Sequence, residues 1–167
     1  DKYNVSVPRY TSYPPANFFR PFTGEEFLKE VDYSNEVCEK KLSFYFHMPF
    51  CRRLCHYCGC NSYPMAKEER VEAYVQALHK EIDLVAKHID KSRRISQIHY
   101  GGGSPTAMPV SVLKELNEHL LSLFSTIEQP EIAIECHPGY LTAEDWQGLL
   151  DARFNRFSLG VQDFNCL

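Results

Sequence analysis

The sequence predicts an α/β fold in which parallel strands alternate with helices, as in the first half of a (β/α) barrel that follows an extended N-terminal arm. Three observations support this prediction. Strand-like and helix-like segments alternate from residue 42 to residue 161. In three of the four predicted strands, polar or small side chains share one face and apolar side chains share the other. Four strands cannot close a barrel, so we expect this chain to be the first half of a longer protein.

The N-terminal part divides into an arm and a short helix. Residues 1–22 contain four prolines and many aromatic residues, which indicates an extended arm that lies over a surface. Thr23 and Glu26 then have the spacing of a capping box, which predicts a helix that ends before a polar turn at Ser34 and Asn35. The apolar side chains of this helix are Phe27, Leu28 and Val31. We therefore predict an arm with a short helix over residues 1–40 and a truncated barrel of four strands over residues 41–167.

The barrel segments follow in order. Alternation predicts a first strand over residues 42–47, and an apolar stripe from Val71 to Val85 predicts a long helix after it. A second strand over residues 95–100 precedes a helix that begins near Pro109. The third strand is predicted over residues 131–136, and the fourth over residues 156–161. Between them, Thr142 caps a helix that carries Trp146, Leu149 and Leu150.

The parity of the strands predicts which side chains face the interior of the barrel. The polar or small faces carry Ser43, Tyr45 and His47 on the first strand, Glu131, Ala133 and Glu135 on the third, and Arg156, Ser158, Gly160 and Gln162 on the fourth. The opposite faces carry Phe, Leu, Ile and Val, which suit packing under helices. We therefore expect a polar lumen, with the functional groups at the C-terminal ends of the strands.

Composition narrows the functional classes. The chain has 167 residues, of which 44% are hydrophobic, which suffices for one domain with a buried core. No apolar run is long enough to span a membrane. A formal charge of -4 without a basic stretch argues against nucleic acid as the partner. Seven cysteines, mostly clustered, indicate a reducing compartment, so we expect a cytoplasmic protein.

Four of the seven cysteines lie within ten residues, at Cys51, Cys55, Cys58 and Cys60. Thiolates at this spacing can converge on a soft metal centre, either an iron–sulfur cluster or zinc. A structural zinc site usually shows two separated ligand pairs, whereas this chain has a single CxxC. A disulfide is a poorer explanation on so tight a loop. Spacing alone favours a cluster and leaves zinc and a redox dithiol as alternatives.

The spacing of Cys51, Cys55 and Cys58 is that of the radical S-adenosylmethionine (SAM) enzymes. Further segments, from near the first residue to near the last, make the chain resemble one family among these enzymes, the oxygen-independent coproporphyrinogen III oxidases. The segments that carry the resemblance are Pro8–Pro14, Phe46–Cys51, Cys58–Asn61, Gly101–Thr106 and Phe154–Asn165. The implied fold is a radical SAM-type partial (β/α) barrel.

The resemblance also implies cofactors and a site. It implies a 4Fe-4S cluster held by Cys51, Cys55 and Cys58, with one iron left for SAM. The cofactor-binding residues that it implies are Tyr45, Tyr57, Gly102, Gly103, Ser104, Glu135 and Gln162. In the family Tyr45 lies beside the cluster, and Tyr57 is the aromatic residue inside the CxxC. Cys60 and His47 are the catalytic candidates, and we expect Cys60 near the cofactor or the substrate. Packing is the ordinary alternative for Cys60, and a hydrogen bond is the ordinary alternative for His47.

Two departures from the family pattern bear on the site. Ser104 stands where threonine is more usual, which keeps the hydroxyl group. After Glu135, this chain has Cys136–Gly139 where better-known members have an acidic residue and an arginine. Any role of those two groups in binding or protonation is therefore not expected here.

The activity that the resemblance implies is the oxidation of coproporphyrinogen III to protoporphyrinogen IX, by decarboxylation of two propionates to vinyls, in haem biosynthesis. A haem chaperone-like sibling and a haem-opening methyltransferase are the alternatives. We expect coproporphyrinogen III and an electron donor as partners, a monomer when the protein is complete, and no activity from the 167 residues alone.

Overall fold

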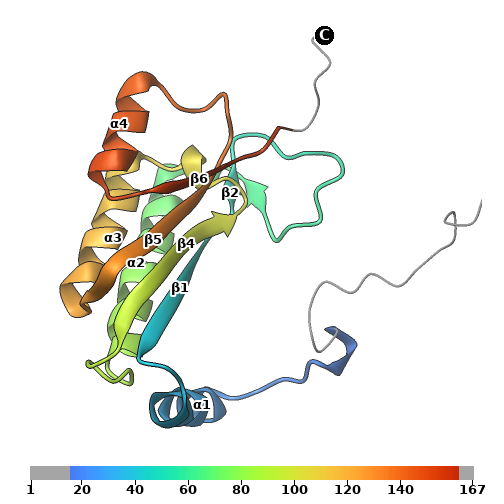
Figure 1. Ribbon diagram of the computed structural model, residues 1–167. Helices are drawn as coiled ribbons and strands as arrows, with labels where there is room; N and C mark the ends of the chain where they lie inside the picture. Colours follow the sequence, from blue (N-terminus) through green and yellow to red (C-terminus); the bar gives the residue numbers. More distant parts are fainter. Residues whose placement is uncertain (1–15, 162–167) are drawn as a thin grey trace, which may run out of the picture.

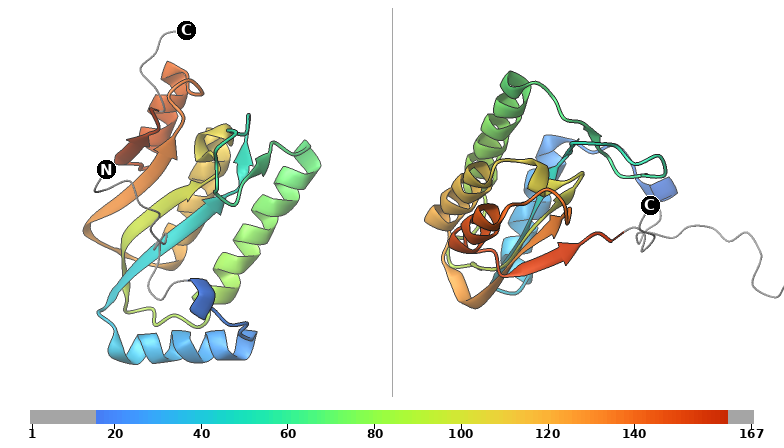
Figure 2. Two further views of the ribbon diagram at one scale, coloured as in Figure 1. Left: turned by 90° about the vertical axis from the view of Figure 1, so that its right-hand side faces the viewer. Right: turned by 90° about the horizontal axis from the view of Figure 1, so that it is seen from above.

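Four parallel strands form the main sheet of the protein, and the computed structural model describes residues 16–161. Their order is β1 (Lys41–Met48), β4 (Arg94–Gly102), β5 (Thr126–Cys136) and β6 (Arg156–Leu159). One face of the sheet is covered by the helices α2 (Glu68–Ala86), α3 (Val110–Leu123) and α4 (Ala143–Asp151) (Figures 1 and 2). The predicted alternation of parallel strands and helices is therefore confirmed.

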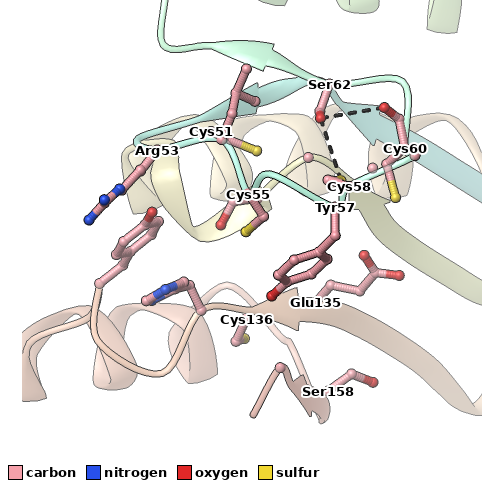
Figure 3. A pocket seen from close by; sticks show the side chains of 18 of the residues that line it. Cys51, Arg53, Cys55, Tyr57, Cys58, Cys60, Ser62, Glu135, Cys136 and Ser158 are labelled. Carbon is pink, nitrogen blue, oxygen red and sulfur yellow. Dashed lines mark hydrogen bonds between the residues drawn. The ribbon is translucent and has the colours of Figure 1, made fainter. Parts of the chain in front are cut away.

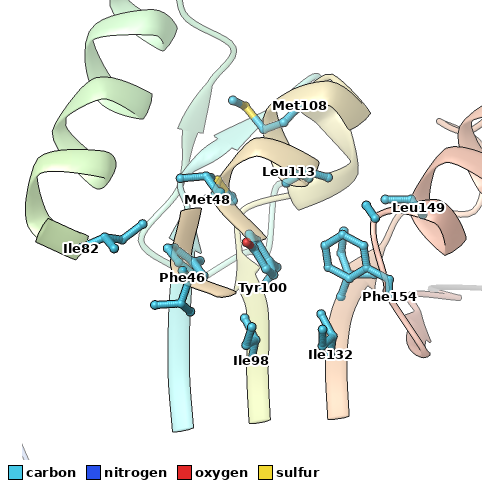
Figure 4. Close-up of a cluster of buried hydrophobic side chains, with 14 of the residues drawn as sticks. Phe46, Met48, Ile82, Ile98, Tyr100, Met108, Leu113, Ile132, Leu149 and Phe154 are labelled. Atoms are coloured by element: carbon cyan, nitrogen blue, oxygen red, sulfur yellow. The ribbon is translucent and has the colours of Figure 1, made fainter. Parts of the chain in front are cut away.

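The hydrophobic core lies between the sheet and these three helices (Figure 4). The strands present Ile98 and Ile132 to it, and α3 contributes Leu113, all nearly inaccessible to solvent. The ring of Tyr100 stacks on Phe46 at 4.7 Å between centroids and meets Phe154 edge-on at 5.2 Å. The other face of the sheet carries exposed polar side chains, as the strand parity predicted.

A buried polar contact joins the sheet to α3 and to the end of α4. Asn117 is 1% exposed; its Oδ1 accepts a hydrogen bond from the Tyr100 hydroxyl and its Nδ2 donates to the Ala152 carbonyl, each at 2.9 Å. Both partners are buried, so neither can form a hydrogen bond with water if the amide is removed. This contact therefore fixes how α3 and α4 sit on the strands.

We expect Asn117→Ala to lower the free energy of unfolding by about 2–4 kcal/mol, because two buried polar groups would lose their partner and a cavity would form. Urea denaturation followed by circular dichroism measures this change. The neighbouring exposed residue provides the control, since Glu118→Ala should change the free energy of unfolding by less than about 0.5 kcal/mol. Equal effects from the two variants would contradict this account of the core.

All four predicted strands are present, but several of their boundaries differ from the prediction. β5 begins at Thr126 rather than Glu131, and the register with β4 jumps from Ile95 opposite Thr126 to Gln97 opposite Glu131. The irregular stretch contains Pro130, which cannot donate to a ladder, and this explains why alternation did not reveal it. β6 ends at Leu159, two residues before the predicted end.

The helix α1 (Gly24–Val37) lies below the amino ends of the strands (Figure 1). Its capping box between Thr23 and Glu26 is present as predicted, but the predicted end at Ser34 and Asn35 is wrong. Asn35 donates to the His88 carbonyl at 2.7 Å, and the Ser34 hydroxyl accepts from Arg93 at 3.1 Å. These side chains attach α1 to the α2–β4 connection, so the helix runs on to Val37. None of its residues is buried.

The predicted arm falls mostly outside the described residues. Within it, η1 (Ala16–Phe18) forms one turn of 3-10 helix, and residues 19–22 are exposed without regular structure. Among residues 16–161, no helix has the length and apolar character needed to cross a membrane.

Candidate functional site

The cysteine-rich loop begins directly after β1 and is closed at its base by two short strands. β2 (Phe50–Cys51) pairs in parallel with β3 (Tyr63–Pro64), and the backbone N–H of Met65 donates to the Cys51 carbonyl at 2.8 Å. This pairing was not predicted, because two residues are too few to show a pattern. It fixes Cys51 at the base of the loop.

The loop covers a cavity of about 550 Å³ at the carboxyl ends of the strands (Figure 3). Nine of the predicted site residues line it: Cys51, Cys55, Tyr57, Cys58, Cys60, Gly102, Gly103, Ser104 and Glu135. They come from the loop, from the end of β4 and from the end of β5, which lie far apart in the sequence. The parallel topology brings them together, because all four strands end at the same edge of the sheet.

The donor set fits a cluster. Among residues 16–161, no three His, Cys, Asp or Glu side chains converge closely enough to bind one metal ion. A zinc site needs such convergence, with sulfur ligands about 2.3 Å from one ion. The cysteines of a cubane cluster bind different iron atoms and need only face a common space. Cys51, Cys55 and Cys58 all face this cavity, which can accommodate a cluster.

Cys58 and Cys60 differ in their surroundings. The pKa of the Cys58 thiol is lowered by hydrogen bonds from the backbone and thiol of Cys60 and from the Ser62 hydroxyl. The pKa of the Cys60 thiol is raised by its hydrogen bond to Cys58 and by the negative charge there. At a given pH, Cys58 therefore carries the thiolate more readily than Cys60 does, and their predicted roles stay predictions.

The glycines at the end of β4 allow close approach of the cysteine loop. A Cβ atom at Gly103 would lie 2.9 Å from the Pro49 carbonyl and 3.0 Å from the sulfur of Cys51. Gly102 has a φ of 113°, and a Cβ atom there would lie 2.7 Å from the His47 ring. The backbone N–H of Gly103 donates to the Met48 carbonyl at 2.8 Å. These glycines therefore pack the end of β4 against the base of the loop.

Glu135 and Tyr45 lie together on the open face of the sheet. The Glu135 carboxylate accepts from His99 at 3.3 Å, and the ring of Tyr45 stacks on His99 at 5.8 Å between centroids. Partial burial raises the pKa of Tyr45, and the charge of Glu135 raises it further, so the hydroxyl stays protonated at neutral pH. Tyr45 is not among the described residues that line the cavity. It is nevertheless close to Glu135, because a Cβ atom at Gly101 would lie 3.0 Å from both side chains.

His47 has structural partners on both ring nitrogens. Its Nε2 donates to the Asn61 carbonyl at 2.8 Å, and its Nδ1 lies 3.3 Å from the Tyr45 hydroxyl. Asn61 belongs to the returning limb of the cysteine loop, so His47 ties that limb to β1. With these contacts His47 has a positioning role, and its catalytic role stays a prediction. Gln162 lies outside the described residues.

Sequence reasoning missed four other residues that line the cavity, namely Arg53, Ser62, His137 and Tyr140. His137 and Tyr140 follow β5, where the chain departs from the pattern of the family that it resembles. Their rings stack at 3.8 Å between centroids. That departure was the signal that could have identified them, since an altered strand end changes the wall of the site.

A buried fifth cysteine lines the same cavity but should not react. Burial raises the pKa of the Cys136 thiol to about 11, so about one molecule in a thousand carries the thiolate at pH 8. We expect iodoacetamide to label the exposed Cys55 and to spare Cys136 in the native, metal-free protein. Reactivity of Cys136 should appear only as the pH rises toward its pKa. Peptide mass spectrometry measures both sites, and equal labelling at pH 8 would contradict the burial.

Comparisons with known proteins agree with this geometry. The family model of the radical SAM superfamily matches residues 45–166. A curated relative from Synechocystis sp. is 37% identical over 166 residues, which cover 99% of this chain and 35% of the relative. One from Escherichia coli K12 is 40% identical over 165 residues, covering 98% of this chain and 35% of the relative. Both are named oxygen-independent coproporphyrinogen III oxidase.

A solved structure shares the fold as well. The coproporphyrinogen III oxidase HemN from Escherichia coli, described as a radical SAM enzyme, superposes with a TM-score of 0.82 at 36% identity. The match covers 93% of this chain and 35% of that one. The chain thus spans about a third of the length of the relatives and the structure that it matches.

Proposed function

This chain belongs to the radical SAM superfamily, and from that premise we propose that the protein carrying it oxidises coproporphyrinogen III to protoporphyrinogen IX without oxygen. The observation that carries the proposal is the single cavity that joins three cysteines at the required spacing, the glycine-rich end of β4 and the Glu135 carboxylate. The names of the relatives support the substrate. The division into an arm over residues 1–40 and a barrel over residues 41–167 belongs to the same proposal.

The residues have distinct tasks in this proposal. Cys51, Cys55 and Cys58 would hold the 4Fe-4S cluster through their thiolates, which leaves one iron for SAM. When bound, the cluster and SAM supply a carbon-centred radical that can remove a hydrogen atom from a substrate side chain. The residues proposed to contact the cluster or SAM are Tyr45, Tyr57, Gly102, Gly103, Ser104, Glu135 and Gln162.

The remaining chemistry occurs on the substrate. Each reacting propionate would lose one hydrogen atom to that radical, carbon dioxide, and one electron to an external acceptor, and would become a vinyl group. We propose that Cys60, whose thiol pKa is raised by its hydrogen bond to Cys58, acts near the reacting carbon. His47 would hold the loop against β1 during this step. An external donor must reduce the cluster, and we propose a cytoplasmic protein that is monomeric when complete.

The cavity is open to solvent, since Tyr57 and Leu159, which line it, are 72% and 55% exposed. A radical reaction needs its site closed to water and to competing hydrogen donors. We therefore propose that chain beyond the described sheet supplies the opposite wall, and that these 167 residues alone show no turnover.

Product analysis tests the proposed function. The complete protein would be incubated anaerobically with SAM, a strong reductant and coproporphyrinogen III, and the porphyrins would be separated after oxidation. We expect protoporphyrin and release of two carbon dioxide molecules per substrate. Haem binding without turnover would favour the chaperone-like alternative, and opened haem would favour the methyltransferase. Either of these results without protoporphyrin overturns the proposal.

A further inference from the structure

One end of the cavity carries a cation without a partner. Arg53 is the only Lys or Arg among the described residues that line the cavity, and Glu135 is the only carboxylate. Figure 3 shows them at opposite sides of the cysteine loop. Glu135 interacts with His99, whereas Arg53 forms no ion pair or hydrogen bond with any residue from 16 to 161. Its guanidinium is therefore available to a ligand.

A second donor lies at the same cavity, on the connection after β5. The backbone N–H of Gly139 donates to Nδ1 of His137 at 3.1 Å, so the neutral ring carries its proton on Nε2. The His137 backbone N–H donates to the hydroxyl of Thr106 at 3.0 Å, and Thr106 is 1% exposed. These two hydrogen bonds hold the backbone and the ring of His137 in place. Nε2 has no partner in the described part of the chain.

Tyr140 is fixed between this ring and the cysteine loop. His137 stacks on one side at 3.8 Å, and the guanidinium of Arg52 lies 4.7 Å from the ring centroid. Tyr140 lines the same cavity. Arg53, His137 and Tyr140 therefore contribute a guanidinium, an imidazole N–H and a phenol to the lining of one cavity.

We propose that Arg53, with His137 and Tyr140, forms a binding site for a carboxylate of the ligand. A guanidinium offers paired N–H donors that match the two oxygens of a carboxylate, and the imidazole N–H adds a third donor. The inference rests on the proposed function, whose substrate carries four propionates. Only two of these react, so a contact with an unreacted propionate would orient the ring without consuming the group that it holds.

SAM also carries a carboxylate, on its methionine part, so the two sources must be separated. Figure 3 shows Arg53 and Glu135 on different sides of the cysteine loop, and Glu135 is one of the residues proposed to contact SAM. This separation favours a propionate of the tetrapyrrole. The bound substrate would then span the cavity from Arg53 toward Glu135.

The test measures binding to the complete, anaerobically reconstituted protein rather than turnover. Coproporphyrin III, the fluorescent oxidised form of the substrate, is titrated by fluorescence quenching beside its tetramethyl ester, which has no charge. SAM binding is measured separately by equilibrium dialysis, and iron content is determined for every sample. The variants are Arg53→Gln, Arg53→Lys and His137→Ala. Arg70→Gln is the matched control, because Arg70 is exposed on α2 and does not line the cavity.

We expect Arg53→Gln to weaken coproporphyrin III binding roughly tenfold while binding of the ester, SAM and iron stays unchanged. Arg53→Lys should recover part of the loss, and His137→Ala should weaken binding about threefold. His137→Ala keeps the test valid if Arg53→Gln loses iron, since it lies outside the cysteine loop. A loss confined to SAM binding would assign the same site to the methionine carboxylate.

Unchanged binding of both ligands by Arg53→Gln and His137→Ala would overturn the inference while leaving the proposed function intact. Failure of the unmodified protein to bind coproporphyrin III would instead count against the proposed function. In that case the SAM measurement alone decides whether the carboxylate site exists.

Discussion

Replacing Cys51, Cys55 or Cys58 by alanine is expected to abolish the iron–sulfur cluster, whereas Cys60→Ser is expected to keep it. Three thiolates would hold three irons, and Cys136 is poorly suited to replace one of them, because it is buried with a raised pKa. Cys60 differs, since it donates to Cys58 and its own pKa is raised. Iron and sulfide content after anaerobic reconstitution, with the visible absorption spectrum, measures the outcome.

The Cys60→Ser variant distinguishes a role of Cys60 as an iron ligand from a role in the reaction. Cys60→Ser should retain the iron content and the spectrum of the unmodified protein and lose most oxidase activity in the complete protein. Loss of the cluster in this variant would show that Cys60 coordinates iron. Full activity would show that its role is packing. Each result excludes one of the roles weighed for this residue.

Gly103→Ala is expected to disrupt the site although it replaces none of the cysteines that are proposed to bind iron. The added methyl group would lie 2.9 Å from the backbone carbonyl of Pro49 and 3.0 Å from the sulfur of Cys51. Backbone cannot move aside as a flexible side chain can, so Cys51 would be displaced from the base of the loop. We expect several-fold lower iron content and a loss of about 1–3 kcal/mol in the free energy of unfolding.

The control for this substitution lies in the cysteine loop itself. A Cβ atom at Gly59 would meet nothing within 4 Å, so Gly59→Ala should keep both iron content and stability. If Gly103→Ala also loads iron normally, the close packing of β4 against the loop does not position Cys51. Comparison of the two variants thus isolates the steric effect from the general effect of losing a glycine.

Local signals in the sequence were sufficient for most of the fold. Alternation identified β1 and the inward faces of the strands, and Thr23 and Thr142 marked the starts of α1 and α4 through capping boxes that the structure confirms. The apolar stripes identified α2 and α3. Where prediction failed, a tertiary contact decided the outcome, as at Asn35, whose side chain bonds to the α2–β4 connection and lets α1 continue.

The candidate site was predictable only in part. The cysteine spacing identified the candidate ligands, and the resemblance supplied Gly102, Gly103 and Glu135, all of which line the cavity. His137 and Tyr140 were signalled only by the departure from the family pattern after Glu135. Arg53 had no signal in the sequence, because its place at the cavity depends on how connections from different strands meet. The steric reason for Gly103 also appears only when the distance to Cys51 is known.

Electron paramagnetic resonance of the reduced protein decides whether three cysteines hold a cluster with one iron open to SAM. We expect about four irons per chain without zinc, and a spectrum of the reduced cluster that changes when SAM is added. One tightly bound zinc without iron, or a cluster spectrum that SAM leaves unchanged, would contradict it.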